Sequence, residues 1–444
     1  MFFSIRNVKN IFLIEDLRNK LFFTFGVLAV FRFGVHVPIP GFDTVALGEL
    51  MNNVTSGGFM GYLNLFSGGA LQNIAIFSLG ISPYINASIM IQILSMIVPE
   101  LEALSKEGEY GRRKINNYTR YLAFVLSIFY SIVLLTTFEA FYGNLVLVPG
   151  WGFRLTTIMM LTAGSQLVMW LGEQINQYGI GQGSSLIIFA GIVTGLPGGI
   201  LKLVGGVMGN SIDPLIAIAI VLFLLVLLGC IVFLEKGERR ITVQYAKRVV
   251  GQRVYGGVSS YIPFKLNSAG VVPVIYATFM LTPFMTIINW ISGKSEGSFP
   301  QIKMLASLFE YGSPAYYVIF ALMIIFFSFL YTSIQYRPDD IADNLRKSGG
   351  FIPGIRPGRR TAEFIEYLLT RVGLPGSIYL ASLAIFPDIA LKALSSPVIF
   401  SGTGLLIAVG VALDTSAQVE AALIDRKYEG FLSKGRLKGR YGRG

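Results

Sequence analysis

Long apolar runs with almost no charge alternate with short polar or basic stretches along most of this chain of 444 residues. Each run has about the 17–25 residues that an α-helix needs to cross a bilayer. The pattern predicts ten membrane-spanning helices and therefore an all-α, polytopic membrane protein. The predicted ranges are 21–37, 74–98, 118–138, 154–172, 184–204, 215–234, 268–291, 316–334, 362–386 and 400–418.

One apolar segment, residues 59–71, is too short to cross a membrane and is interrupted by glycines. It is also too apolar to sit in water alone. Backbone that neither spans nor leaves the membrane is tolerated only where protein or a water-filled cavity surrounds it. The segment therefore predicts a channel or transporter with a piece of chain folded into its mouth.

Composition agrees with a membrane protein, because only 14% of the residues are charged, against about 25% in soluble domains. The single cysteine, Cys230, excludes an internal disulfide, and with the single histidine, His36, it cannot supply four Cys/His ligands to zinc. We expect neither a metal nor a cofactor. His36 ends the first predicted span, where a packing role is expected rather than catalysis.

Lysine and arginine are concentrated in alternate polar stretches, namely 1–20, 99–117, 235–265, 335–361 and 419–444. Cytoplasmic loops of membrane proteins carry such an excess. We therefore predict that both termini and these loops are cytoplasmic, which requires an even number of spans. The net charge of +11 is then largely a cytoplasmic charge. The predicted parts of the chain are a cytoplasmic segment (1–20), two sets of five helices (21–204 and 205–418) and a basic tail (419–444).

Two of the basic loops are large enough to fold. The loop 235–265 holds two β-type runs, 240–245 and 252–255, and predicts a hairpin that stands off the membrane. The loop 335–361 begins with an amphipathic helical turn and ends in a Gly/Pro-rich stretch. Topology and anionic lipid headgroups account for basic charge in general. Two structured basic projections on one face favour a docked partner that is rich in phosphate or carboxylate.

The predicted spans contain very few ionisable residues. Asp414, near the cytoplasmic end of the last span, and Arg32, near the outer end of the first, are the main exceptions. Ion-coupled transporters usually keep such residues inside their helices. The sequence also lacks the metalloprotease, serine hydrolase and P-loop motifs. A channel and a secondary transporter of small solutes both fit ten spans, whereas no catalytic set supports a membrane enzyme.

Two spans, the second and the seventh, begin alike. Gly80-Ile81-Ser82-Pro83 opens one and Gly270-Val271-Val272-Pro273 opens the other. These are the second helices of the first and second five, so the match fits an inverted repeat with the pathway between the halves. Proline early in each helix predicts a freed backbone carbonyl and a hinge.

Several longer motifs point to one family. They lie at 38–41 (PIPG), 66–71 (FSGGAL), 80–89 (GISPYINASI), 107–115 (EGEYGRRKI), 170–175 (WLGEQI), 179–183 (GIGQG), 238–248 (ERRITVQYAKR), 342–358 (ADNLRKSGGFIPGIRPG) and 417–420 (AQVE). With these motifs, the chain resembles the SecY family, the central subunits of the bacterial protein translocation channel, from about Arg18 to Arg440.

The resemblance implies two inverted five-helix halves that form a clamshell around an hourglass pore. A ring of aliphatic side chains would form the constriction, and a plug near residues 59–71 would seal the outer funnel. Positions that match the ring are Ile81, Ile85, Ile188, Ile275 and Ile407, and a sixth position, often aliphatic in the family, is Ser184 here. Plug positions are Phe59, Met60, Tyr62, Leu63, Leu65, Phe66, Ser67, Gly68, Gly69, Ala70 and Leu71.

By the same resemblance, helices 2 and 7 form a lateral gate through which apolar segments leave for the lipid. Its positions are Pro83, Asn86, Ile89, Pro273 and Thr278. Asn86 and Thr278 are polar residues, and we predict that they form a hydrogen bond across the closed gate. Bonds of this kind contribute about 0.6 kcal/mol in membranes, which is small enough to break.

The resemblance also implies a passive channel of the bacterial cytoplasmic membrane that conducts unfolded preproteins and binds their signal sequences. The implied partners are the motor ATPase SecA, the ribosome, small subunits like SecE and SecG, and anionic lipids. The basic positions that would receive SecA or the ribosome are Arg239, Arg240, Lys247, Arg248, Arg253, Arg346, Lys347, Arg356, Arg359 and Arg360.

Overall fold

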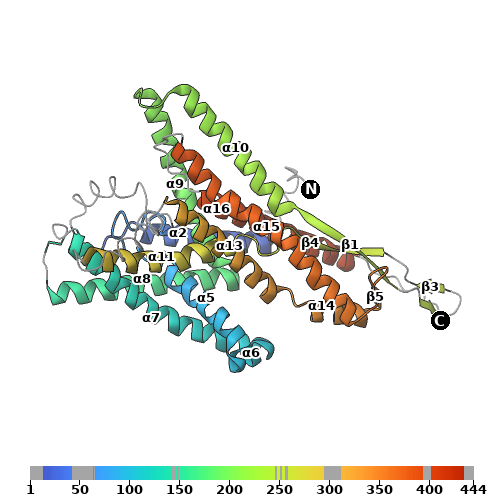
Figure 1. Cartoon of the computed structure of the whole chain (residues 1–444). Coiled ribbons are helices and arrows are strands. Elements are labelled where there is room, and N and C mark those ends of the chain that lie inside the picture. Colours follow the sequence, from blue (N-terminus) through green and yellow to red (C-terminus); the bar gives the residue numbers. More distant parts are fainter. Residues whose placement is uncertain are drawn as a thin grey trace.

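The computed structural model describes residues 14–42, 64, 66–141, 146–147, 150–245, 248–250, 253–255, 259–294, 312–393 and 402–434. These residues are mostly helical (Figure 1). The helices are α2 (Glu15–Gly34), α5 (Ser82–Ile97), α6 (Pro99–Lys106), α7 (Glu109–Phe141), α8 (Trp151–Tyr178), α9 (Gly183–Met208), α10 (Pro214–Lys236), α11 (Val272–Lys294), α13 (Pro314–Gln335), α14 (Pro338–Lys347), α15 (Arg359–Ala393) and α16 (Gly402–Lys434).

Each predicted span coincides in large part with one of the long helices. Within the described part of the chain, seven helices are long and apolar enough to cross a membrane, or up to eight if the bent pair α5 and α6 forms one span. The seven are α7, α8, α9, α10, α13, α15 and α16. The span that contains α13 extends through α14, from Pro314 to Lys347. The structure therefore shows a multi-span membrane protein, and the number ten stays a prediction.

The second predicted span begins later than the sequence indicated. Residues 67–81 form turns, apart from a bridge at Ala75, and α5 starts at Ser82. The backbone explains the difference, because Ile74 and Gly80 have φ angles of 37° and 54°, which a helix cannot accommodate. At the other end α5 bends by 101° into α6. Val98 is extended there because it precedes Pro99.

The same packing order recurs in the two sets of five helices. In the first set α5 packs on α7, α7 on α8, α8 on α9, and α2 on both α8 and α9. In the second set α11 packs on α13, α13 on α15, α15 on α16, and α10 on both α15 and α16. Each pair has its counterpart at the same place in the other set. Between the sets, α5 contacts α11 and α9 contacts α16, which are also equivalent positions.

The basic loop after α10 folds into strands, but with a pairing that the sequence did not predict. Strand β1 (Glu238–Tyr245) pairs antiparallel with β4 (Ser259–Lys265), while β2 (Arg248–Val250) and β3 (Arg253–Tyr255) pair with each other. The run 240–245 is therefore not the partner of 252–255. Strand β5 (Gly350–Phe351) of the second basic loop adds to the far edge of β1. This long-range pairing ties the two loops together.

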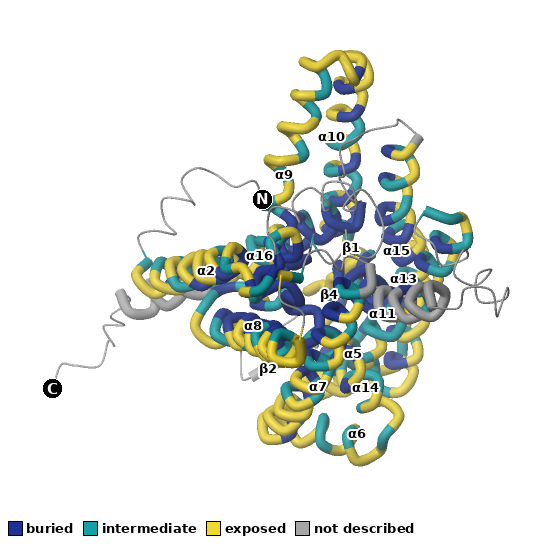
Figure 2. Tube along the Cα trace, turned by 90° about the vertical axis from the view of Figure 1, so that its left-hand side faces the viewer, coloured by how far each residue is buried: buried dark blue, intermediate teal, exposed yellow. Residues whose placement is uncertain are grey.

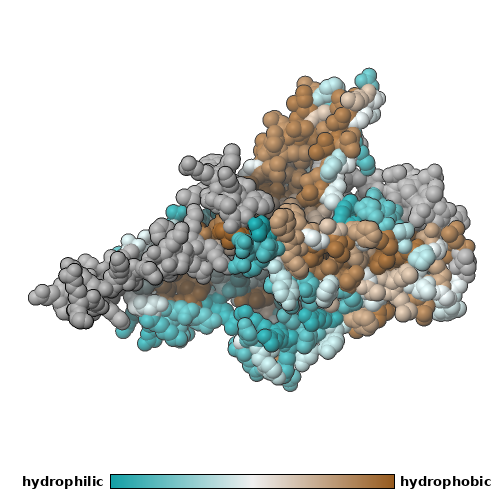
Figure 3. All heavy atoms as spheres, turned by 180° about the vertical axis from the view of Figure 1, so that it is seen from behind, coloured by the Kyte–Doolittle hydropathy of each residue, from teal (hydrophilic) through white to brown (hydrophobic). Residues whose placement is uncertain are grey.

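The buried residues gather along the middle of the bundle, whereas the α9–α10 hairpin stands out of it and is largely exposed (Figure 2). Figure 3 shows apolar side chains over this hairpin and hydrophilic ones around α6 and α14. Leu201, Leu222 and Phe233 of the hairpin are 72%, 63% and 72% exposed. Apolar surface on this scale marks contact with lipid or with another protein.

Candidate functional site

The five isoleucines of the predicted ring lie within one buried apolar core of forty described residues, and their arrangement as a ring stays a prediction. Ile81 directly precedes α5, and Ile85 lies one turn further along the same helix face. Ile188 comes from α9, Ile275 from α11 and Ile407 from α16, so both sets of helices contribute. All five are at most 5% exposed and belong to one apolar cluster. We call these residues the isoleucine cluster.

Two small residues, Gly172 and Ser184, lie beside this cluster. A Cβ placed on Gly172 of α8 would lie 3.5 Å from Cδ1 of Ile81 and 3.4 Å from Cδ1 of Ile187. Ser184, the sixth predicted position, is half-buried at the second residue of α9. Its backbone amide lies 3.6 Å from the same Cβ position. The backbone of Ser184 therefore lies near Gly172, at the beginning of the helix.

A cavity of about 330 Å³ lies between the beginnings of α9 and α11 and the middle of α16. Its lining includes Gln182, Ser185, Val271, Asp414, Thr415 and Gln418. Polar side chains thus line the space beside the apolar centre, and both sets of helices contribute to it. Asp414, which the sequence singled out as a rare acid in a span, is one of these lining residues.

Of the predicted plug, residues 66–71 are described, and we call them the plug turn. Phe59, Met60, Tyr62, Leu63 and Leu65 lie outside the described residues. Phe66 is 2% exposed, and Ala70 and Leu71 are fully buried at 0%. Phe66 and Ala70 belong to the same apolar cluster as the five isoleucines. Two residues of the plug turn therefore share one large buried core with the isoleucine cluster.

The plug turn touches helices of both sets. The ring of Phe66 lies 5.0 Å, centroid to centroid, from the ring of Phe279 on α11. A Cβ on Gly80, just before α5, would lie 3.4 Å from Cα of Ser67. Gly68 has a φ of +70°, and a Cβ on it would lie 3.0 Å from Cα of Gly191 on α9. Glycine is needed here by both the backbone conformation and the close approach.

Arg32 of α2 completes the contacts of the plug turn. Its Nη1 atom donates a hydrogen bond of 2.6 Å to the carbonyl oxygen of Gly68. The sequence marks Arg32 as a rare charge near the end of a span but does not identify its partner. A lone arginine in an otherwise uncharged span was the signal available.

The two predicted gate prolines start their helices. Pro83 is the second residue of α5, and Pro273 is the second residue of α11. Backbone N–H groups in the first turn of a helix have no acceptor within that helix, so a proline at this position costs no hydrogen bond. The predicted hinge at these prolines is therefore wrong. Gly80 and Gly270, three residues earlier, both have positive φ angles, 54° and 62°. The two G-x-x-P motifs thus have the same local conformation.

A hydrogen bond joins α5 and α11, the helices of the predicted gate, between two residues outside the predicted set. The hydroxyl of Tyr276 on α11 donates to Oε1 of Gln92 on α5 over 3.1 Å. Asn86 donates to the hydroxyl of Tyr130 on α7, 2.7 Å away, and Thr278 donates to the backbone carbonyl of Val274. The predicted bond between Asn86 and Thr278 stays a prediction. Ile89 is buried in the apolar cluster.

The described basic residues belong to the strands, to α14, and to the start of α15 and the turn before it, and Figure 1 shows the strands and α14 at one end of the molecule. Arg239, Arg346, Lys347, Arg356, Arg359 and Arg360 are exposed. Arg240 is also exposed but contacts Glu238 at 2.6 Å and lies over the ring of Tyr261, and the Glu238 carboxylate raises its pKa. Arg359 lies 3.4 Å from Glu363. Arg248 and Arg253 lie in β2 and β3, and Lys247 is outside the described residues.

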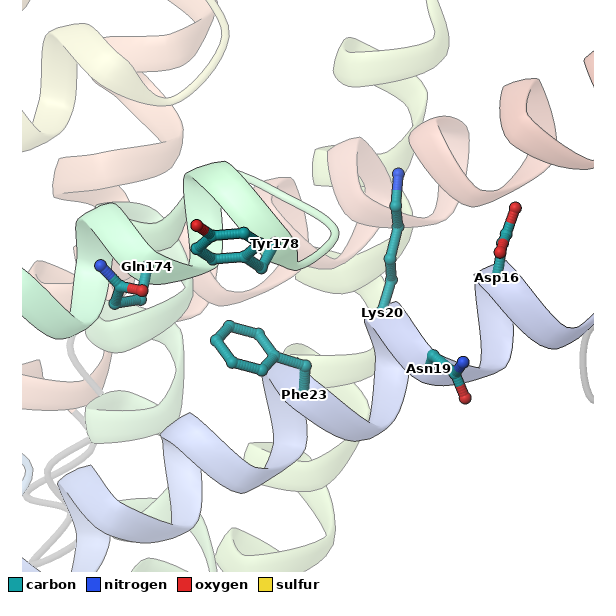
Figure 4. A pocket seen from close by; sticks show the side chains of 6 residues that line it. All are labelled: Asp16, Asn19, Lys20, Phe23, Gln174 and Tyr178. Carbon is teal, nitrogen blue, oxygen red and sulfur yellow. The ribbon is translucent and has the colours of Figure 1, made fainter.

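A second cavity, of about 500 Å³, lies on the outer surface between α2 and α8. Figure 4 shows Phe23 and Tyr178 turned toward each other, while Lys20 and Asp16 point away from them. The side chains do not converge on one point, so they form no ligand set. Among the described residues, no group of three or more His, Cys, Asp or Glu is placed to hold a metal ion.

Comparison with known proteins gives one consistent family. The SecY family matches residues 75–416. Protein translocase subunit SecY of Rickettsia bellii (strain RML369-C) is 42% identical over 427 residues, which cover 96% of this chain and 98% of the relative. Protein translocase subunit SecY of Escherichia coli (strain K12) is 42% identical over 430 residues, which cover 96% of each chain.

Solved structures share the fold. A protein-conducting channel matches with a TM-score of 0.67 at 16% identity over 95% of both chains. A SecY protein whose plug domain stabilises the closed channel matches with a TM-score of 0.65 at 15% identity over 95% of both. Sec61 in a canine ribosome–channel complex matches with a TM-score of 0.62 at 16% identity over 95% of both.

Proposed function

Because this chain belongs to the SecY family, we propose that it is the central subunit of a protein-conducting channel. The channel carries unfolded secretory polypeptides across the membrane and releases transmembrane segments sideways into the lipid. The observation that carries the proposal is one large buried core, in which Phe66 and Ala70 of the plug turn lie together with the five isoleucines from both sets of helices. A similar structure is that of a SecY protein whose plug domain maintains a membrane seal.

In this proposal the ten spans form two inverted halves around an hourglass pore. The recurring packing order of the two sets of helices supports it. The matched conformations of Gly80 and Gly270, at equivalent positions, support it as well. The contacts α5–α11 and α9–α16 then form the two sides of the clamshell, and the pathway runs between them.

The isoleucine cluster forms the constriction of this pore. Apolar side chains hold water and ions weakly, so a narrow apolar collar blocks ions by dewetting. The same side chains offer no fixed hydrogen-bond partners, so polypeptides of any sequence slide past them. Ser184 beside the cluster leaves this collar with one polar member. The plug turn seals the collar on its outer side.

The helices α5 and α11 form the lateral gate. The bond from Tyr276 to Gln92 crosses it, and hydrogen bonds between membrane helices contribute about 0.6 kcal/mol on average. An entering apolar signal segment gains about 25 cal/mol for each Å² of apolar surface that it removes from water. Even a short signal segment therefore outweighs the loss of this bond. Asn86 and Thr278 lie on the same two helices and add a second bond in the proposed closed gate.

The channel is passive, and its partners supply energy. The exposed arginines near β1, α14 and the start of α15 form the docking face for a motor ATPase such as SecA and for the ribosome. The ribosome is the partner of one structural neighbour, Sec61 in the canine ribosome–channel complex. These loops and both termini are cytoplasmic by their basic charge. Small subunits like SecE and SecG, together with anionic lipids, cover apolar helices such as the α9–α10 hairpin. The membrane is the bacterial cytoplasmic membrane, as in the relatives' family.

Depletion of the protein tests the proposal. A tightly regulated copy is shut off, and the processing of a secreted preprotein is followed by pulse labelling. We expect unprocessed precursor to accumulate inside the cell. Normal processing together with the loss of uptake of a small solute would contradict the channel function and would favour a transporter.

A further inference from the structure

Arg32 is the only charged residue in the stretch from Leu21 to Gly34 of α2. A charged side chain at the centre of a membrane helix costs about 2.5–3.5 kcal/mol on insertion, and less near the end. Such residues are functional candidates when they face the protein interior. Arg32 is half-buried and faces the plug turn, with its Nη1 atom 2.6 Å from the carbonyl oxygen of Gly68.

The position of Arg32 is set by its neighbours on α2. Phe31 is fully buried and stacks on Phe77, with 5.9 Å between the ring centroids. The ring of Phe77 occupies the space that a Cβ on Gly34 would need. These contacts lie on both sides of Arg32 along the sequence, so its side chain extends from a packed part of α2.

The plug turn is held differently at its two ends. Just after it, the backbone is joined to the chain that follows α2, through bonds from Ile39 to Ile74 and from Ile76 to Val37. Backbone pairing of this kind does not depend on any side chain. At Gly68 the link to α2 is a side-chain hydrogen bond, and beside it the turn packs on Gly191. Loss of this one side chain therefore weakens the hold on this end, which still packs through Phe66 on Phe279, while the other end stays attached.

We propose that Arg32 is the positioning residue that holds the plug turn closed over the isoleucine cluster, by binding the Gly68 carbonyl. The inference rests on the proposed channel function. When a polypeptide enters, the Arg32–Gly68 bond breaks, the turn swings out about its attached end, and the bond forms again when the pore empties. A hydrogen bond from a charged donor is strong enough to shift such an equilibrium by about tenfold to hundredfold.

Passive ion leak through the purified channel complex in lipid vesicles tests this inference. We expect Arg32→Met to raise the leak of the resting complex by about tenfold or more, and Arg32→Lys, which keeps a charged donor, to stay much closer to the wild type. Arg120→Met is the matched control, because it removes an arginine that pairs with Glu173 at 2.7 Å, between α7 and α8. Its leak should equal that of the wild type.

A second measurement reports the plug directly. In a Cys230→Ser background, Phe66→Cys and Phe279→Cys are joined by a short thiol cross-linker, and the yield measures how often the turn is closed. We expect the yield to fall with Arg32→Met and to recover with Arg32→Lys. If Arg32→Met does not accumulate in the membrane, Arg32→Gln, which removes the charge but keeps donors, takes its place.

The outcomes separate the two proposals. Unchanged leak and unchanged cross-linking in Arg32→Met, in a complex that still translocates a preprotein, would overturn the role of Arg32 and leave the channel function intact. A wild-type complex that translocates no preprotein would overturn the channel function itself.

Discussion

At the scale of single residues, the two glycines of the plug turn distinguish the need for an unusual backbone conformation from the need for space beside α9. Gly68 and Gly69 both have positive φ angles, 70° and 88°, so any other L residue is strained at either position. They differ in their surroundings, because a Cβ on Gly68 would lie 3.0 Å from Cα of Gly191, whereas a Cβ on Gly69 meets nothing closer than 4.0 Å. The pair therefore distinguishes backbone strain from contact with α9.

We expect Gly68→Ala to open the plug more than Gly69→Ala does. Both variants carry about 1–3 kcal/mol of strain, but only Gly68→Ala also pushes the turn off α9. The measurement is the yield of cross-linking between Phe66→Cys and Phe279→Cys in the Cys230→Ser background. Equal yields for the two variants would show that the contact with Gly191 does not hold the turn.

Arg356 is the residue through which we test the proposed docking face. Its backbone carbonyl accepts a hydrogen bond from Thr361 over 3.1 Å, and its side chain is exposed. A substitution of the side chain therefore leaves the loop folded. We expect Arg356→Glu to reduce motor-driven translocation in vesicles by tenfold or more, because it replaces an attraction to the motor with a repulsion. A loss of about 1.4 kcal/mol of binding free energy lowers the affinity tenfold. Arg356→Lys keeps the charge and should retain most of the activity, while normal translocation by Arg356→Glu would remove this residue from the docking face.

At the scale of elements, the gate helices begin with a glycine in the left-handed region and a proline at the second helical position. Proline at the start of a helix loses no hydrogen bond and brings a favourable φ angle. The G-x-x-P motif is therefore a helix-start signal, repeated in both sets of helices, rather than a hinge.

We expect Pro83→Ala to change the unfolding temperature of the detergent-purified protein only slightly. Gly80→Ala should lower it clearly, since Gly80 has a φ of 54° and a Cβ there would lie 3.4 Å from Cα of Ser67. A large loss of stability in Pro83→Ala, equal to that of Gly80→Ala, would argue that the proline does more than begin the helix.

At the scale of the whole molecule, the two sets of helices meet along α5–α11 and α9–α16. The proposed lateral release would require one of these seams to open, and the bond from Tyr276 to Gln92 marks the seam between α5 and α11. Closing this seam covalently should leave the fold intact and prevent release.

We expect a cross-link between Gln92→Cys and Tyr276→Cys, in the Cys230→Ser background, to stop the membrane insertion of a signal-bearing protein. A reducible cross-linker allows cleavage, after which insertion should recover. The single variants treated with the same reagent are the controls. Full insertion through the cross-linked protein would show that apolar segments leave by another route.

Sequence alone determined the class of this protein, its helical segments and the residue types at its centre. In lipid, a run of uncharged apolar residues can form the hydrogen bonds of its own backbone only as a helix. The spans therefore follow from local composition, and so does the amphipathic helix α14. The five isoleucines and the plug motif were predicted from resemblance. The isoleucines, Phe66 and Ala70 are buried in one large core, and their roles stay predictions.

Tertiary structure alone decided the contacts between segments far apart in the chain. It paired β1 with β4 and β5, started α5 at Ser82, joined Tyr276 to Gln92 and placed Arg32 on the plug turn. The physical reason is that a hydrogen-bonding group has many acceptors of equal chemistry along the chain, such as the backbone carbonyls. Only the packing of the helices decides which of them comes within 3 Å.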